Sequence, residues 1–437
     1  MYPPKKFDIT WPDLAFGLAA CGRDHDADQQ RMAAAVEQRF ADGSGAGTGA
    51  VRRFGGHRPT RWSGGGDGAD SARADSCLAT LSVRSALDLC LTASGLPPGS
   101  EVLMSAVTIP DMWQVVREHG LVPVPVDIEP GTLLPRPEQW LAAATPRTKA
   151  VIVAHLLGTQ APLDDLVTLA QERGWLLVED CAQAYSGPSF RGDPGADLTL
   201  FSFGPIKTAT ALGGALAVVR DAALLASMRE LHRSWPVQKR SDQAGRIAKY
   251  GWFALLTERP VYTGVTAAAR LLGIDPGDRM QSTVGAFAGR DLMPAIRHRP
   301  SPALLALLER RLRADTATSV TERAETARRL VSLLPTGSVV YGAEAPVHTY
   351  WLCAVPTRDP AATAARLRAA GFDATRPTSL AAVPAPAGRE PGARTAAHLV
   401  RHAVCLPFHP GMPDRALERM AAVVDPEMHG LKAVTVP

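Results

Sequence analysis

Short apolar runs alternate with amphipathic stretches between residues 78 and 220 of this chain. The runs are short enough to be strands buried on both faces, and they cover 102–106, 122–126, 150–154, 175–178, 198–203 and 215–219. Segments with apolar residues at helical spacing lie between them, at 85–93, 113–119 and 163–173. This alternation predicts an α/β fold with a mostly parallel sheet sandwiched by helices. Ligands of such folds bind beyond the carboxyl ends of the strands, so we look for chemistry there.

The pattern changes after residue 220. Residues 221–300 are helical and irregular, and residues 301–334 predict one strong helix. A smaller α+β domain follows, in which 350–355 reads as a strand and both 360–370 and 415–424 read as helices. The chain thus ends in a second, smaller domain.

The N-terminal region predicts an arm rather than a domain. Residues 1–23 look irregular, residues 26–41 form an amphipathic pattern, and the glycine-rich tracts 43–49 and 64–68 read as loops. We therefore expect three parts: an arm, helix and glycine-rich loops in 1–75, a large domain in 76–265, and linker helices with the small C-terminal domain in 266–437.

Composition narrows the class of protein. Of 437 residues, 46% are hydrophobic, which supports a large core, and the net charge of +4 is too small to favour a nucleic-acid partner. No apolar run approaches the roughly 20 residues of a membrane span. The six cysteines show no CxxC spacing, which indicates reduced thiols and a cytoplasmic protein. The histidines show no HxH or HExxH spacing, so we expect no metal site.

Two residues beyond neighbouring runs suit one cofactor. Asp180 ends one apolar run, and Lys207 follows the run at 198–203. Pyridoxal phosphate needs an amine that holds it as a Schiff base and a carboxylate that keeps its pyridine nitrogen protonated. The alternative interpretations without a cofactor are that Lys207 is a solvated surface lysine and that Asp180 caps a helix.

The motifs around these residues resemble those of a known family. VEDCAQA at 178–184, Ser202-Phe203 with Lys207, and Gly213-Gly214-Ala215 resemble the signature of the DegT/DnrJ/EryC1/StrS aminotransferases. Weaker similarities occur at 146–158, at 375–377 and at 406–412. The resemblance implies the pyridoxal-phosphate-dependent transferase fold type I and a homodimer with active sites at its interface.

The resemblance also implies roles for individual residues. Lys207 would form the Schiff base and move the substrate's α-proton, and Asp180 would pair with the pyridinium nitrogen. Gln183 would reach the ring hydroxyl, and Ser202 would donate to the phosphate. Arg376, within Thr-Arg-Pro, would bind a substrate or donor carboxylate, although a surface arginine that fixes a loop is an equally good interpretation.

Several positions depart from the family pattern. Arg84 stands where the family has a small threonine at the start of a helix, so we expect Arg84 and Ser85 to contact the cofactor phosphate. Ile109 stands where an aromatic side chain usually stacks on the cofactor. Gly277 replaces an asparagine that often reaches the phosphate from the partner subunit, and Arg84 would supply the missing contact.

The activity expected from the resemblance is transfer of an amino group from an amino-acid donor to a small-molecule keto or aldehyde acceptor, such as a keto-sugar or another natural-product intermediate. The altered phosphate and stacking positions keep a second possibility open, namely another pyridoxal-phosphate reaction on an amino acid: elimination, replacement or cyclisation. A non-catalytic paralogue is the third, and the set of Asp180, Gln183 and Lys207 argues against it.

Overall fold

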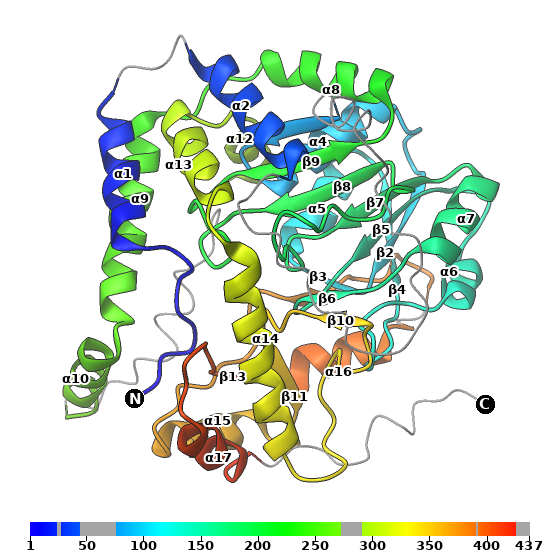
Figure 1. Cartoon of the computed structure of the whole chain (residues 1–437). Coiled ribbons are helices and arrows are strands. Elements are labelled where there is room, and N and C mark those ends of the chain that lie inside the picture. The colour runs from blue at the N-terminus through cyan, green and yellow to red at the C-terminus, as the bar shows by residue number, and fades with distance from the viewer. Residues whose placement is uncertain (24–27, 44–75, 272–290, 390–391, 425–437) are drawn as a thin grey trace.

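The structure, a computed structural model, describes residues 1–23, 28–43, 76–271, 291–389 and 392–424 (Figure 1). The glycine-rich tracts 44–49 and 64–68, and Gly277, lie outside the described residues.

A central sheet of seven strands forms the large domain, in the order β1-β9-β8-β7-β5-β2-β4. The strands are β1 (Cys77–Thr80), β2 (Glu101–Ser105), β4 (Val122–Val126), β5 (Thr148–Ala154), β7 (Leu176–Asp180), β8 (Leu198–Ser202) and β9 (Ala215–Val219). Among these strands, β9 is antiparallel to both of its neighbours, β1 and β8, and the other neighbouring strands pair in parallel. The predicted mostly parallel sheet is therefore confirmed. The sequence pattern does not predict β1, because four residues are too few for a periodicity.

Helices cover both faces of this sheet. On one face lie α4 (Val83–Ser94), α5 (Pro110–Glu118) and α8 (Ala222–Arg233), and on the other lie α6 (Pro137–Ala143), α7 (Asp164–Arg173), α2 (Gln29–Asp42) and α13 (Pro302–Leu312). The alternation of strand side chains explains this arrangement. Met104 packs under α4 and α5, whereas its neighbour Leu103 packs under α6 and α7. The predicted amphipathic helix at 26–41 is confirmed as α2.

The start of the chain is more ordered than its sequence pattern predicts. Helix α1 (Trp11–Cys21) replaces part of the irregular segment predicted for residues 1–23, so that expectation is wrong for residues 11–21. Thr10 caps this helix by accepting from the backbone N–H of Asp13, whose side chain in turn accepts from Thr10. Helix α1 packs against α13 and α9 (Arg240–Leu256), and α10 (Arg259–Leu271) follows α9 at the same edge (Figure 1).

The predicted helix at 301–334 is two helices. After the short α12 (Leu292–Ile296), α13 ends at Leu312, and α14 (Thr316–Leu333) begins after three intervening residues. Asp315 caps α14, because its carboxylate accepts from the backbone N–H of Thr318 at 3.1 Å. The break lets α13 pack on the large sheet while α14 continues down to the small domain (Figure 1).

The small domain packs around α14 and a two-stranded sheet. Its elements are β11 (Cys353–Pro356), β13 (Ala403–Leu406), α15 (Pro360–Ala369), α16 (Arg394–His402) and α17 (Asp414–Ala421). Two short strand pairs join it to the large domain: β10 (Val347–His348) with β6 (Thr159–Gln160), and β12 (Ala381–Ala382) with β3 (Val107–Thr108). Tyr2, at the other end of the chain, packs in the core of this domain, so the arm spans both domains.

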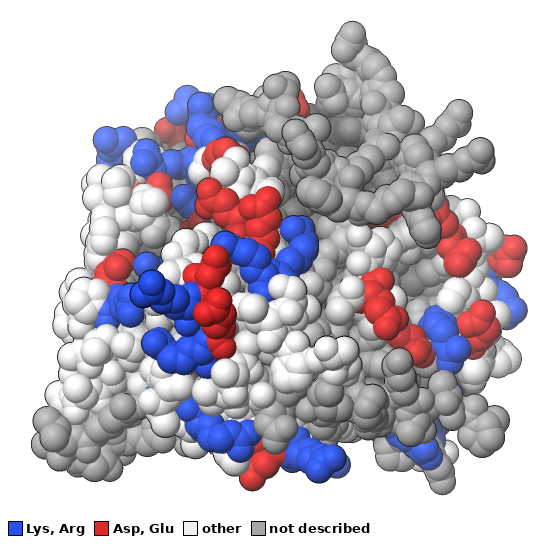
Figure 2. Space-filling model, turned by 60° about the horizontal axis from the view of Figure 1, so that its bottom comes forward, with Lys and Arg blue, Asp and Glu red and all other residues white. Residues whose placement is uncertain are grey.

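The surface carries mixed charge. On the face shown in Figure 2, basic and acidic side chains of the described residues lie among one another and do not separate into fields of one sign. None of the helices in the described part is long and apolar enough to cross a membrane.

Candidate active site

Asp180 and Lys207 meet at the carboxyl edge of two neighbouring strands. Asp180 is the last residue of β7, and Lys207 lies in the turn after β8, where its backbone N–H donates to the carbonyl of Gly204 at 3.0 Å. β7 and β8 pair in parallel, so their ends share one edge of the sheet. The two charges are close enough for Asp180 to raise the pKa of Lys207 and for Lys207 to lower that of Asp180. The structure thus brings together the two residues that carry the predicted chemistry.

Asp180 is buried and is not a helix cap. Its Oδ1 atom accepts from the backbone N–H of Ala182 at 2.9 Å, and the residues that follow it form a turn rather than a helix. Burial raises the pKa of Asp180, and Lys207, His155 and Arg84 partly offset this effect. The backbone N–H of Ala182 and the nearby charges thus stabilise the carboxylate, but they do not fully replace the water that burial removes.

Lys207 is not a solvated surface lysine. Burial lowers its pKa to about 8, with Asp180 acting against this shift and Arg84 adding to it. Its Nζ atom lies 4.4 Å from the ring centroid of Trp351. The indole is fixed at this place, because its Nε1–H donates to the carbonyl of Ile206, next to Lys207, at 2.9 Å.

Gln183 and Ser202 lie beside this pair, with side chains engaged locally. The Oε1 atom of Gln183 accepts from the backbone N–H of Leu157 at 2.8 Å. The Ser202 hydroxyl accepts from the backbone N–H of Gly204 at 3.4 Å, a weak contact that leaves its proton free to turn toward another acceptor. Their roles toward a cofactor stay predictions.

Arg84 reaches the site, but it has a partner there. Its Nε atom donates to Asp111 at 2.5 Å, while its charge acts on both Asp180 and Lys207. Burial lowers the pKa of this guanidinium, and Asp111 opposes that shift. A phosphate at this place would have to compete with Asp111, so the predicted phosphate contact stays a prediction.

Ser85 and Ile109 face the protein interior. The Ser85 hydroxyl donates to the carbonyl of Ile296 at 2.7 Å, and its backbone N–H donates to the Ser82 hydroxyl at 3.2 Å. Ile109 directly precedes α5 and packs against the apolar clusters on both sides of it. The Ser85 hydroxyl and the Ile109 side chain thus already have partners within the protein. Their contacts with a cofactor stay predictions.

Arg376 lies on the small domain and is exposed. Its Nη2 atom donates to the backbone carbonyl of Arg401 at 3.2 Å. This contact fits the interpretation of an arginine that fixes a loop. Its role in binding a carboxylate stays a prediction.

Three further residues near Lys207, namely Lys5, Arg323 and Trp351, are functional candidates that the sequence analysis does not indicate. Lys5 lies with its Nζ atom 3.8 Å from the Trp351 ring centroid, and Arg323, from α14, donates to the Thr208 hydroxyl at 3.3 Å. Residues 5, 207, 323 and 351 come from separate parts of the chain. Only the packing of the arm and the small domain on the large domain could reveal this cluster.

The backbone around the cluster is strained. Leu157, Ala209 and Tyr350 have positive φ angles of 56°, 53° and 47°. Residues other than glycine rarely adopt such backbone angles, and those that do are often found at functional sites. Gly158 has φ +100°, and a Cβ atom there would lie 2.5 Å from the backbone nitrogen of Trp351. The loop after β5 and the segment that carries Trp351 therefore approach each other as closely as glycine permits.

One group of metal-ligand side chains lies behind Asp180. Ligand atoms of His155, Glu179 and Cys181 come within 4.8 Å of one another, and all three residues are buried. His155 already contacts Glu179 at 2.9 Å, and Glu179 also accepts from Thr199 at 2.9 Å. Burial raises the pKa of Cys181 well above its usual value, so its thiol is a poor ligand. We interpret the group as a hydrogen-bonded support for the end of β7.

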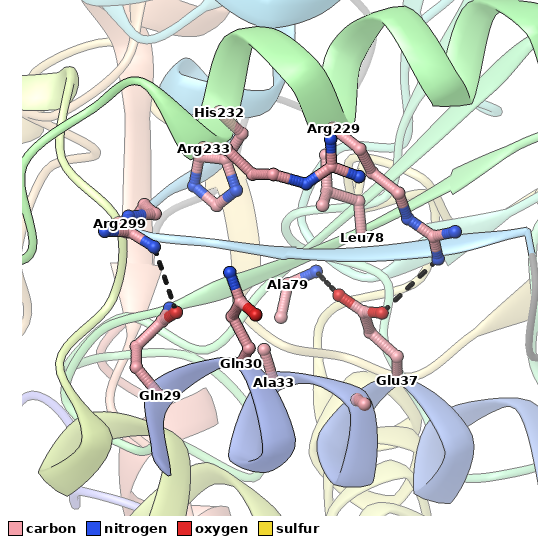
Figure 3. A pocket seen from close by; sticks show the side chains of 11 residues that line it. Gln29, Gln30, Ala33, Glu37, Leu78, Ala79, Arg229, His232, Arg233 and Arg299 are labelled. Carbon is pink, nitrogen blue, oxygen red and sulfur yellow. Dashed lines mark hydrogen bonds and ion pairs between the residues drawn. The ribbon is translucent and has the colours of Figure 1, made fainter. Parts of the chain in front are cut away.

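A cavity of about 190 Å³ lies elsewhere, between α2, β1 and α8 (Figure 3). Its charged walls are paired: Glu37 accepts from the backbone N–H of Ala79 at 2.8 Å, Arg229 donates to the carbonyl of Cys77 at 2.9 Å, and Arg299 to that of Trp235 at 2.9 Å. Its lining includes neither Asp180 nor Lys207. We assign it no part in the chemistry.

Comparison with known proteins links this geometry to a family. The family model "DegT/DnrJ/EryC1/StrS aminotransferase family" matches residues 68–251. The chain is 39% identical over 167 residues to the "Erythromycin biosynthesis sensory transduction protein EryC1" of Saccharopolyspora erythraea, which covers 37% of this chain and 45% of the relative. It is 38% identical over 167 residues to the "L-glutamine:2-deoxy-scyllo-inosose aminotransferase" of Streptomyces kanamyceticus, covering 37% of this chain and 39% of the relative. The matches thus span less than half the length of these curated relatives.

A solved structure extends the likeness of fold to the whole chain. The aminotransferase TlmJ from Streptoalloteichus hindustanus superposes with a TM-score of 0.64 at 20% identity, covering 100% of both chains. At that identity the likeness shows the fold, and it confirms the predicted α/β transferase fold. The segment that matches the DegT/DnrJ/EryC1/StrS aminotransferase family model contains Asp180, Gln183, Ser202 and Lys207 in the spacing of the family signature.

Proposed function

We propose that this protein is a pyridoxal-phosphate-dependent aminotransferase that moves an amino group from an amino-acid donor to a keto or aldehyde acceptor. The observation that carries the proposal is the pair of Asp180, a buried carboxylate, and Lys207, an amine with a lowered pKa, at one edge of the sheet. The pair lies inside the segment that matches the family.

The residues at this edge fit pyridoxal phosphate. Within the described part of the chain, Asp180 uses Oδ1 for a backbone N–H, which leaves Oδ2 to pair with a cationic ring nitrogen. Ser202 and Arg84 are donors within the same region that suit a phosphate, and Gln183 is held beside them. When bound, the cofactor supplies a carbonyl that condenses with amines and a ring that withdraws electrons from the substrate's α-carbon.

Lys207 is suited to hold the cofactor and to move a proton. An amine must be neutral to attack a carbonyl or to accept a proton. With a pKa of about 8, roughly one Lys207 in ten is neutral at pH 7. The negative charge of Asp180 keeps the pKa from falling further, so the same residue can also donate the proton back.

The substrate class is inferred from a named relative. The Streptomyces kanamyceticus protein is named for L-glutamine and 2-deoxy-scyllo-inosose. We accordingly propose glutamine or glutamate as the amino donor and a cyclic ketone, either a cyclitol or a keto-sugar of a natural-product pathway, as the acceptor.

We also propose a homodimer. Helices α1, α9 and α10 lie along one edge of the molecule (Figure 1), and five of the eight large exposed apolar residues in the described part of the chain belong to them. These five include Trp11 and Leu18 on α1 and Trp252 on α9, of which Trp252 is 60% exposed. Such a patch is typical of an interface. All six cysteines are free thiols, five of them buried, and this supports a cytoplasmic location.

The proposal is tested by finding the lysine that holds the cofactor. The protein is incubated with pyridoxal phosphate, reduced with borohydride and digested, and we expect the pyridoxyl mass on the Lys207 peptide. The exposed Lys149 serves as the reference lysine, and Lys207→Ala should abolish the label. Incubation of the loaded protein with L-glutamine or L-glutamate should release the corresponding 2-oxo acid. A label on another lysine, or none, would refute the proposed function.

A further inference from the structure

We propose that Lys5, from the N-terminal arm, and Arg323, from α14, bind the α-carboxylate of the amino donor. This inference rests on the proposed function, because it assumes that an amino acid reacts at Lys207.

The arm holds Lys5 in place from both sides. On one side, the backbone N–H of Tyr2 donates to the carbonyl of Gly371 at 2.8 Å, within the small domain. On the other, the carboxylate of Asp8 accepts from the backbone N–H of Ala209 at 2.6 Å, two residues after Lys207. The segment that carries Lys5 therefore crosses from the small domain to the loop of the reactive lysine. The Lys5 residue is only partly buried, and its Nζ atom also donates to the backbone carbonyl of Trp351 at 3.4 Å.

Lys5 and Lys207 contact the same indole. Their Nζ atoms lie 3.8 Å and 4.4 Å from the Trp351 ring centroid, so they are at most about 8 Å apart. The α-carboxylate of an amino acid is attached to the carbon that carries the reacting amine. A carboxylate on a substrate that reacts at Lys207 therefore falls within the reach of the flexible Lys5 side chain.

One hydrogen-bond donor of Arg323, the Nη2 atom, has no partner among the described residues. Its Nε atom donates to the carbonyl of Thr349 at 3.0 Å, and its Nη1 atom donates to the hydroxyl of Thr208, the residue after Lys207. These two bonds fix the plane of the guanidinium. The Nη2 atom is buried and has no hydrogen-bond partner among the described residues. A buried donor without a partner is unfavourable, and an oxyanion would satisfy it.

The charges around these two side chains favour an anion. Burial lowers the pKa of Lys5 well below its usual value, and the charges of Arg323 and Lys207 lower it further. Asp8 is the carboxylate that opposes them, and it is also held by Arg311 at 3.0 Å. The neighbouring Cys405 has a pKa of about 12 and stays an uncharged thiol. A bound carboxylate would relieve the repulsion between the cations.

The geometry points to Arg323 rather than Arg376 as the arginine that meets the donor. Arg376 is exposed and bonds to a backbone carbonyl, whereas Arg323 lies one side chain away from Lys207. A guanidinium edge combined with an ammonium group can bind both oxygens of a carboxylate.

Calorimetric titration with glutarate tests the site without any reaction. Glutarate carries carboxylates but no amine, and glutaramide is its neutral counterpart. We expect the cofactor-loaded protein, at constant ionic strength, to bind glutarate and not glutaramide. Lys5→Met and Arg323→Gln should each weaken glutarate binding at least tenfold. The matched controls are Lys6→Met, on the exposed neighbour of Lys5, and Arg329→Gln, on the exposed side of α14.

The outcomes separate this inference from the proposed function. Release of 2-oxo acid from glutamate with equal KM values in the parent and in Lys5→Met would overturn the carboxylate site while leaving the aminotransferase in place. Selective glutarate binding that both variants lose would support the site even if no amino transfer occurred. Equal binding of glutarate and glutaramide by the parent protein would overturn it outright. Thermal unfolding identifies a variant that has lost its fold, and Lys5→Arg should restore binding.

Discussion

The electrostatic coupling between Asp180 and Lys207 gives the sharpest prediction. Burial and Arg84 lower the pKa of Lys207 from 10.5 to about 8, and Asp180 acts in the opposite direction. Asp180→Asn removes this opposing charge, so the pKa of Lys207 should fall below 8. Loss of a nearby opposite charge typically changes proton affinity by about tenfold or more, which corresponds to about 1.4 kcal/mol.

The expected effect is measurable because the neutral fraction changes steeply near pH 7. At that pH, a lysine with an ordinary pKa is neutral in about one molecule in three thousand, and Lys207 in about one in ten. A further tenfold loss of proton affinity would make Lys207 neutral in about half of the molecules. Acylation of Lys207 at pH 7 should therefore be about fivefold faster in Asp180→Asn than in the parent.

Competitive labelling measures this in the cofactor-free protein. Samples are treated briefly with acetic anhydride between pH 6 and pH 10, and peptide mass spectrometry compares Lys207 with the exposed Lys149. The parent midpoint should lie near pH 8, and Asp165→Asn, a change on the exposed side of α7, should leave it there. A parent midpoint near that of Lys149 would show that Lys207 is solvated. A midpoint that rises in Asp180→Asn would contradict the coupling itself.

Four further substitutions test the phosphate contact, the donor site and the dimer. Arg84→Thr should weaken cofactor affinity by roughly 1.5–3 kcal/mol, about ten- to more than a hundredfold, whereas Asp111→Asn, which removes the carboxylate charge that competes with a phosphate, should not weaken it; fluorescence titration measures both. Equal affinities in Arg84→Thr and the parent would exclude the phosphate contact. Arg376→Lys should leave the KM for the amino donor unchanged, because Arg323 takes the carboxylate; a raised KM would return that role to Arg376. Trp252→Glu should dissociate the dimer, so that sedimentation at micromolar concentration changes from about twice 46.3 kDa to 46.3 kDa; a parent that sediments as a monomer would contradict the interface.

The local pattern of apolar residues was sufficient to predict the central sheet and the positions of Asp180 and Lys207. The strands are continuous apolar runs because both of their faces are buried, and that requirement is visible in a few consecutive residues. Asp180 and Lys207 follow two such runs, and parallel neighbours place their carboxyl ends at one edge. The position of this pair could therefore be predicted without tertiary contacts. The start of α1 and the break before α14 were not predicted, although Thr10 and Asp315 cap these helices through local contacts.

Tertiary packing decided the rest of the site. The arm crosses from the small domain to the Lys207 loop, and this path brings Lys5 to Trp351, a residue 346 positions away. Arg84 pairs with Asp111 because α4 packs against α5, and Arg323 meets Thr208 because the break after α13 directs α14 past the site. A charged side chain takes its partner from whatever group the packing brings near it. Periodicity and spacing report only which face of an element is buried, so the sequence alone could identify Lys207, Asp180 and Arg84 but not Lys5, Arg323 or the pairing of Arg84 with Asp111.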